Sequence, residues 1–153
     1  MKKILAAIFI ILVLPVCANA FPMIYAGTQQ VQFGFEHRDD DWLLEFGYGR
    51  FITDELLLGA LFSYEDNART IWSAGGTMEL HFNLGTMTYP YFSIIAIYQD
   101  YDIDDHILFG PAAGINHFIT DYLSVDIKAR YLLSSESRYD EDLEIIGGLR
   151  VLF

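Results

Sequence analysis

The chain has 153 residues, with 21 acidic and 9 basic side chains, a formal net charge of −12 and a single cysteine. This charge balance excludes nucleic acid as a partner, because phosphate binding needs clustered lysine and arginine. A single cysteine excludes a disulfide framework and a cysteine-rich zinc site. The length suits one domain, but 53% apolar and 16% aromatic residues are unusual for a soluble domain that has no long helical pattern.

The first twenty residues have the plan of a secretory signal peptide. Two lysines precede a thirteen-residue apolar core, and the cleavage motif Ala18-Asn19-Ala20 follows it. The core is shorter than the ~20 residues of a membrane-spanning helix. Lipid attachment at Cys17 is an alternative. It is disfavoured because lipoprotein signals carry a small residue directly before the cysteine, and this chain has Val16 there. We therefore expect export, with a signal peptide at 1–20 and one domain at 21–153.

Beyond residue 21 the dominant period is two, which is the period of a strand with two different faces. Val31, Phe33 and Phe35, for example, alternate with polar or small residues. Turn-type clusters such as RDDD, EDNAR, NLGT and SSESRYDED separate the alternating segments. The pattern predicts eight strands, at residues 29–37, 42–51, 56–65, 71–82, 90–99, 107–118, 123–132 and 143–153.

The alternation divides the strand residues into a bulky apolar set and a small or charged set. The apolar set is Phe46, Tyr48, Leu58, Ala60, Phe62, Tyr64, Trp72, Ala74, Met78, Leu80, Phe92, Ile94, Ala96, Tyr98, Phe109, Ala113, Ile115, Val125, Ile127, Ala129, Tyr131, Ile145, Leu149, Val151 and Phe153. The opposite set is rich in glycine, serine and charge. In a soluble sandwich or lipocalin the bulky set faces inward, whereas in an outer-membrane barrel it faces lipid.

Two features favour the membrane barrel. Glycines recur in the opposite set, as crowding near the axis of a narrow barrel requires. Aromatic residues gather towards the strand ends, as two interfacial girdles would require. We expect Trp42, Tyr64, Trp72, Tyr98 and Tyr101 at one rim, and Tyr48, Phe82, Tyr89, Phe118, Tyr122 and Phe153 at the other.

The last strand carries a more specific likeness. Leu149, Val151 and Phe153 alternate up to a terminal phenylalanine, which resembles the signal by which the barrel-assembly machinery recognises outer-membrane proteins. With the signal peptide and eight strands, residues 21–153 resemble the small OmpA/OmpX-type barrels. The resemblance implies an all-β, eight-stranded, antiparallel up-and-down barrel in the outer membrane of a Gram-negative-type envelope, in contact with lipid and lipopolysaccharide.

The phrase Phe-Ile-Thr-Asp occurs twice, at 51–54 and 118–121, and a degenerate version follows His81. With both termini in the periplasm, these phrases mark periplasmic turns. Threonine and aspartate there satisfy free backbone N–H groups. We expect the phenylalanines to anchor the strand ends near the headgroups; a chance repeat is the alternative.

The same topology places thirteen acidic residues at the extracellular rim and only Asp54, Glu55 and Asp121 in the periplasmic turns. The thirteen are Asp39, Asp40, Asp41, Glu65, Asp66, Asp100, Asp102, Asp104, Asp105, Glu136, Asp140, Glu141 and Asp142. Beside anionic lipopolysaccharide such a rim needs bridging cations. We expect weak divalent-cation association at Asp100, Asp102, Asp104 and Asp105 without a fixed cage; solvated loop tips are the alternative. This stretch opens like an EF-hand but lacks its glycine and its final glutamate.

Seven charged residues of the opposite set are expected to meet inside the barrel: Glu45, Glu79, Asp126, Lys128, Arg130, Glu144 and Arg150. Eight strands enclose a space that side chains just fill. Charges removed from water must pair or lose their charge. We therefore expect an ion-pair network that closes the lumen, with a wet cavity holding unpaired charges as the alternative.

His81 beside Glu79, with Ser73 and Ser93 on neighbouring strands, is the one arrangement to weigh for hydrolysis. It lies at the periplasmic end, away from where lipid-modifying barrels present their sites. The sequence therefore predicts no catalytic residue and no cofactor. We expect a monomeric, non-enzymatic barrel with a structural or surface-interaction role; a narrow channel, a lipid A-modifying enzyme and a soluble ligand carrier are the alternatives.

Overall fold

The computed structural model of the protein describes residues 24–38, 41–66, 70–100, 106–135 and 142–153. The expected signal peptide and several of the loop acids lie outside this part of the chain. The described residues form no helix that is long and apolar enough to cross a membrane.

Eight strands account for most of the described residues, and their ends differ from the predicted ones by at most two positions. They are β1 (Gln29–Arg38), β2 (Asp41–Phe51), β3 (Leu56–Asp66), β4 (Thr70–His81), β5 (Thr88–Asp100), β6 (His106–Phe118), β7 (Leu123–Ser134) and β8 (Asp142–Leu152). Each pairs antiparallel with the next, and β1 pairs with β8, so the predicted closed, all-β up-and-down barrel is confirmed.

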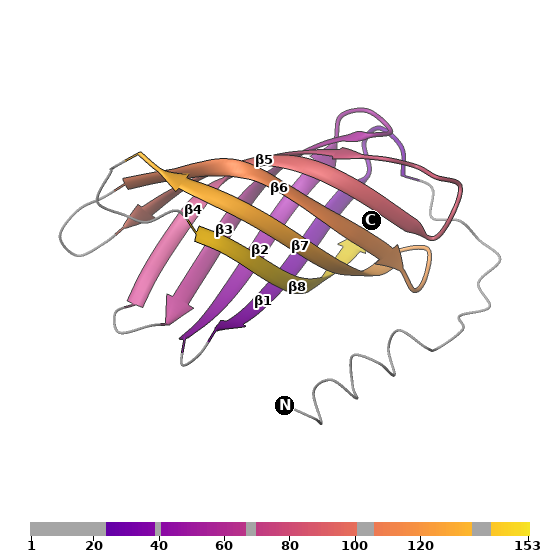
Figure 1. The fold of residues 1–153 in the computed structure, drawn as a ribbon. Helices are drawn as coiled ribbons and strands as arrows, with labels where there is room; N and C mark the ends of the chain where they lie inside the picture. The colour runs from indigo at the N-terminus through magenta and orange to yellow at the C-terminus, as the bar shows by residue number, and fades with distance from the viewer. Residues whose placement is uncertain (1–23, 39–40, 67–69, 101–105, 136–141) are drawn as a thin grey trace, which may run out of the picture.

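The strands wind obliquely around one interior (Figure 1). The turns after β2, β4 and β6 lie at the same end as the C-terminus, and we call this the turn end (Figure 1). We call the opposite end, where the other four connections lie, the loop end. Cross-strand pairs such as Gly49 with Gly59 and Asn116 with Asp126 keep like faces together. The register of the strand pairs therefore places inward-facing residues beside inward-facing residues all around the barrel wall.

The two faces of the wall have the predicted orientation. Phe62, Ile94 and Ile127 lie on the outside with exposed fractions of 46%, 53% and 52%. Glu79, Lys128 and Arg150 lie inside with exposed fractions of 1%, 2% and 0%. This is the reverse of a soluble lipocalin-like barrel, in which apolar side chains fill the interior and charge faces water. The soluble-carrier alternative is therefore excluded.

The interior is more apolar than the sequence indicated. A cluster at the turn end, which we call the turn-end cluster, is formed by Phe51, Leu57, Tyr89, Phe118 and Leu152. A second interior cluster contains Leu61, Ile95, Ile97, Ala112 and Leu132. The opposite set was thus expected to be mostly small or charged, but large apolar residues share it. Those on β3 and β5 were missed because these two strands carry bulky residues on both faces. The others stand at or near the ends of their strands: Phe51, Phe118, Leu132 and Leu152.

The expected girdle at the turn end is partly wrong. Tyr89 and Phe118 are buried in the turn-end cluster and do not face lipid. Tyr48, Phe82, Tyr122 and Phe153 are exposed, as expected. A position near a strand end does not decide which face an aromatic residue occupies. Tyr89 and Phe118 point inward because they alternate in step with the other inward-facing residues of their strands.

At the loop end the aromatic residues form a continuous outer ladder. The Trp42 and Tyr64 rings lie 5.3 Å apart, and the Tyr64 and Trp72 rings 4.6 Å apart. Phe62 adds a further contact with Trp72 at 5.6 Å. Tyr101, expected in this girdle, lies outside the described residues. Edge-to-face and tilted pairs of this kind add to the stability of neighbouring strands.

The repeated Phe-Ile-Thr-Asp phrase builds the same turn twice. In each copy the isoleucine amide donates to the backbone oxygen four residues on, at 2.7 and 2.8 Å. The hydroxyl of Thr53 or Thr120 accepts a hydrogen bond from the amide three residues on, at 3.0 Å in both copies. The degenerate phrase differs, because Asn83 accepts from the amide of Gly85, whose φ is +69°. The predicted role of threonine is therefore confirmed.

The phenylalanines of the phrase were expected near the headgroups, and this was wrong. Phe51 and Phe118 are each 1% exposed and point into the barrel. Their positions have the parity of the interior face, which the apolar character of the side chain does not reveal. The repeat therefore does two things at once: threonine closes a turn and phenylalanine fills the lumen at the turn end.

Replacing Thr120 with valine is expected to lower the free energy of unfolding by about 1 kcal/mol, because the amide of Leu123 loses its side-chain acceptor. Thr53→Val should have the same effect, since its hydrogen bond has the same length. Urea unfolding in detergent measures both. A loss at one site alone would show that the two turns are not energetically equivalent.

Candidate functional site in the barrel interior

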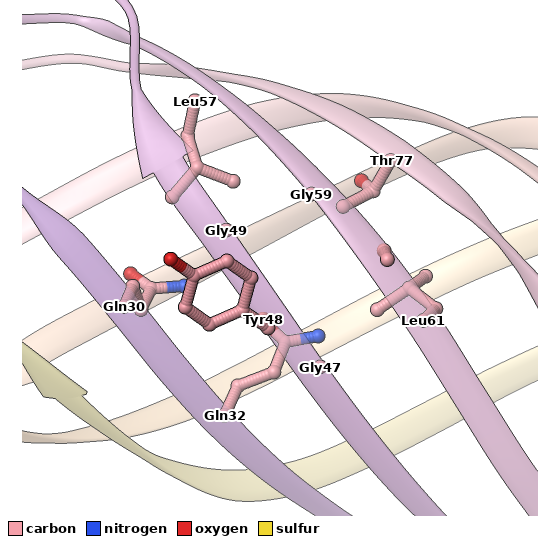
Figure 2. Close-up of a pocket in the computed structure, with 10 residues that line it drawn as sticks. Gln30, Gln32, Gly47, Tyr48, Gly49, Leu57, Gly59, Leu61 and Thr77 are labelled. Atoms are coloured by element: carbon pink, nitrogen blue, oxygen red, sulfur yellow. The ribbon is translucent and has the colours of Figure 1, made fainter. Parts of the chain in front are cut away.

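Glycines make room for the interior side chains on one side of the barrel. A Cβ placed on Gly47 would lie 2.5 Å from Gln32 Cγ, and one on Gly49 would lie 2.7 Å from Leu57 Cδ2. Figure 2 shows Gln32 and Leu57 lying beside these two glycines. Because β2 has no side chain at these points, its neighbours extend across it towards the axis.

The charged residues divide into two clusters. The first, which we call the Glu45 cluster, joins β2 to β7 and β8. Glu45 Oε1 lies 2.5 Å from Lys128 Nζ, and Glu45 Oε2 lies 2.6 Å from Arg130 Nη1. Arg130 Nη2 also lies 2.5 Å from Glu144 Oε2. The amide of Gln32 donates to Glu45 Oε1 at 3.3 Å. Since β2 and β7 are not neighbours in the wall, these contacts cross the lumen.

The second cluster, which we call the Arg150 cluster, is centred on a fully buried guanidinium. Arg150 Nη1 donates to Glu79 Oε2 at 2.6 Å, and Arg150 Nη2 donates to Asp126 Oδ2 at 3.2 Å. The Tyr91 hydroxyl donates to Asp126 at 3.1 Å, and the guanidinium carbon lies 4.4 Å from the centre of the Tyr91 ring. His81 Nε2 lies 3.0 Å from Glu79 Oε2, with its ring stacked on Tyr91.

This arrangement suits the chemistry of buried charge. Removing a carboxylate or guanidinium from water costs several kcal/mol, which only close opposite charges and hydrogen bonds offset. Arginine fits these sites because its planar fork contacts two carboxylates at once, as Arg130 and Arg150 both do. The clusters therefore hold opposite walls of the barrel together by directional contacts.

All seven residues expected in the lumen lie in these two clusters. His81 was expected beside Glu79, but neither it nor Tyr91 was expected to take part in the ion-pair network. His81 could have been included from its parity with Glu79. Tyr91 stands in Tyr-Pro-Tyr-Phe, where both faces carry aromatic residues, so alternation gave no signal for it.

The expected divalent-cation site is largely outside the described residues. Asp100 is exposed at the end of β5, and Asp102, Asp104 and Asp105 follow it beyond the described part. Within the described ranges, no group of three or more histidine, cysteine or acidic residues is placed to hold a metal ion. Cation association at the loop end therefore stays a prediction.

The arrangement weighed for hydrolysis does not form a nucleophile and base. His81 contacts Glu79 through Nε2, and in the described part of the chain no serine hydroxyl is hydrogen-bonded to its ring. Ser73 and Ser93 are buried on β4 and β5. His117, on the outer face, contacts the Thr88 hydroxyl at 2.9 Å. His81, Ser73 and Ser93 therefore do not form the histidine–serine pair that was weighed from the sequence.

The three residues of the expected assembly signal lie along the outer face of β8. Leu149 and Phe153 are exposed and Val151 is partly exposed. They form an apolar strip on β8, beside its partner β1.

No protein-family model matches the sequence, and no curated protein sequence is significantly similar to it. Solved structures are similar in fold. The N-terminal β-barrel domain of Pseudomonas aeruginosa OprF has a TM-score of 0.71 at 14% identity, covering 84% of this chain and 98% of that one. Neisserial surface protein A has a TM-score of 0.59 at 16% identity, with coverage of 82% and 95%. Yersinia pestis outer membrane protein Ail has a TM-score of 0.58 at 11% identity, with coverage of 83% and 99%. The chain thus has the fold of the small OmpA/OmpX-type barrels, as the sequence resemblance implied.

Proposed function

We propose that this protein is a monomeric, non-enzymatic barrel of the outer membrane whose lumen is closed by its own side chains. Its role is structural or surface-interactive: it stabilises the membrane and presents short acidic loops. It is exported by its signal peptide and inserted by the barrel-assembly machinery.

The reversed wall is the observation that carries this proposal. Large apolar side chains are exposed along every strand, while six charged side chains of the two ionic clusters are buried: Glu45, Glu79, Asp126, Lys128, Arg130 and Arg150. Exposed apolar area on this scale is unstable in water and is stable in hydrocarbon. A closed sheet also satisfies its backbone hydrogen bonds internally, which a lipid environment requires.

Charge sets the orientation that we propose. The loop end faces the cell exterior, because most of the acidic residues follow or precede strands there, whereas the turn end carries only Asp54, Glu55 and Asp121. Short turns on the periplasmic side are typical of such barrels. Divalent cations between the acidic loops and lipopolysaccharide would relieve the repulsion between them.

Membrane fractionation tests the location. The protein is expected in the outer-membrane fraction, resistant to carbonate and released by detergent, and its migration on a cold detergent gel should change on boiling. Extraction by salt or carbonate alone would overturn the proposal. The gel shift alone is not sufficient, because it reports the barrel and not its location.

A closed lumen predicts little ion conductance. In planar bilayers the purified protein should show no stable conductance steps, because two ionic and two apolar clusters occupy the interior. The double variant Phe51→Ala/Phe118→Ala, which shortens the turn-end cluster, should leak more than the wild type. The matched variant Phe62→Ala/Phe92→Ala, on the outer face, should not. Stable steps in the wild type would favour the narrow-channel alternative.

A further inference from the structure

Arg50 differs from the other basic side chains that the structure describes, because it lies on the outer wall. It is the penultimate residue of β2, in line with exposed Phe46 and Tyr48. The other three, all discussed above, are buried in the two ionic clusters. Among the described residues Arg50 has no hydrogen-bond or ion-pair partner. A cation on a lipid-facing wall is costly at the bilayer centre and is favourable where it reaches a headgroup.

Neighbouring residues place a further hydrogen-bond donor beside the Arg50 guanidinium. Gln29 of β1 is its cross-strand neighbour. The Tyr48 hydroxyl donates to Gln29 Oε1 at 2.6 Å, so the amide is held with its oxygen occupied and its NH₂ available to donate. The backbone turn at Gly27, with φ of +100°, passes the guanidinium: a Cβ there would lie 3.8 Å from Arg50 Nη2. A side chain at this position would narrow the access to Arg50.

The nearby acidic residue is engaged elsewhere. Asp54 Oδ1 accepts a hydrogen bond from the Ala26 amide at 2.9 Å and makes no ion pair with Arg50. Tyr25, in the same N-terminal segment, is 60% exposed. Tyrosine beside arginine at a strand end is the composition of a membrane interface, with the rings at headgroup depth and the cation reaching outward.

We infer that Arg50 and Gln29 bind the phosphate of a glycerophospholipid in the leaflet at the turn end. Guanidinium binds phosphate through two parallel N–H donors, and the Gln29 amide supplies a third. The exposed apolar residues next along the wall, Phe46 and Leu58, would contact the acyl chains. The inference rests on the proposed membrane location, and it concerns the leaflet opposite the acidic loops.

Native mass spectrometry of the purified protein in detergent tests this site. Dioleoyl phosphatidylglycerol is the probe, and dioleoylglycerol, with the same chains and no phosphate, is the chemical control. The wild type should retain the phospholipid and not the diacylglycerol. Arg50→Gln should weaken retention on the order of tenfold, because a charged hydrogen-bonding group is lost. Equal retention of the two lipids would overturn the inference.

Two further variants separate the site from general effects. Arg69→Gln makes the same charge change at a residue that falls between β3 and β4 in the sequence, and it should leave retention unchanged. Tyr48→Phe removes the hydroxyl that holds Gln29 and should weaken retention less than Arg50→Gln does. If the gel shift shows that Arg50→Gln does not fold, two other variants test the site. Unchanged lipid retention in Tyr48→Phe would refute the role of Gln29. Unchanged lipid retention in Arg50→Lys would refute the need for a guanidinium group.

Lipid retention in native mass spectrometry and location in membrane fractionation test the lipid site and the proposed function separately. A protein that folds in detergent but binds no phosphatidylglycerol refutes the site and leaves the outer-membrane location intact. Displacement of the lipid by millimolar inorganic phosphate would show a free-anion site in its place. Absence from the membrane fraction would instead refute the location on which the inference rests.

Discussion

Replacing Arg150 with alanine is expected to lower the free energy of unfolding by about 3–5 kcal/mol, the cost of breaking a buried ion pair from one side. The guanidinium is 0% exposed and contacts Glu79 and Asp126, so both carboxylates would remain buried without their main counter-charge. Contact with the Tyr91 ring would be lost as well. Urea unfolding followed by tryptophan fluorescence or by the gel shift measures the change.

Three comparisons separate charge from volume in that experiment. Arg50→Ala removes the same side chain from the outer wall and should cost little, because no described residue pairs with it. Arg150→Met keeps most of the volume and should remain strongly destabilising if charge decides the outcome. Adding Asp126→Asn to Arg150→Met should recover part of the loss, since one buried charge is then removed. An unfolding midpoint of Arg150→Ala equal to that of the wild type would falsify the structural role of the Arg150 cluster.

Replacing Gly110 with alanine is expected to lower the free energy of unfolding by at least about 2 kcal/mol, or to prevent folding, because the added methyl group has no space. Gly110 faces the interior, and a Cβ there would run into the backbone oxygen of Tyr131 on the adjacent strand. A backbone atom cannot rotate away as a side chain can. The β6–β7 wall would have to separate locally to admit the methyl group.

Gly147→Ala is the matched control for Gly110→Ala. Gly147 lies on β8 with nothing within 4 Å of an added Cβ, so the same methyl group would enter free space on the outside. Its effect should be small and of either sign, since alanine also reduces the freedom of the unfolded chain. If both variants lose the same free energy of unfolding, glycine is needed at position 110 for its backbone conformation and not for the close approach of the Tyr131 oxygen.

The two ionic clusters and the turn-end cluster explain how a narrow barrel with a charged interior can hold together. Arg130 and Glu45 connect strands that are not neighbours, and Arg150 connects β8 to β4. Phe51 and Phe118, from the two copies of one turn, pack in the turn-end cluster. The repeated phrase is therefore a structural device that closes two turns and fills the space between them.

The alternation of side chains was sufficient to predict the eight strands, their order and the face of most strand residues. Strict alternation, as in Val125 to Tyr131, leaves only one way to place charge and apolar side chains on opposite sides of a strand. Most strands carry bulky residues on one face and small or charged residues on the other, and the glycines of the second face together with the aromatic strand ends predicted that the bulky face lies outside. The seven interior charges were identified for the same reason.

The contacts between these charges, and the inward direction of Tyr91, became clear from the three-dimensional arrangement of the strands. Alternation assigns Glu45 and Arg130 to the same side of the wall, but their contact depends on the register of eight strands and on closure between β1 and β8. Phe118 shares the parity of interior Asn116, whereas Tyr91 lies in a stretch with aromatic residues on both faces, so alternation alone does not show that Tyr91 enters the lumen. The local sequence pattern predicts which face of the wall a residue occupies, whereas its contacts across the lumen depend on how the barrel closes.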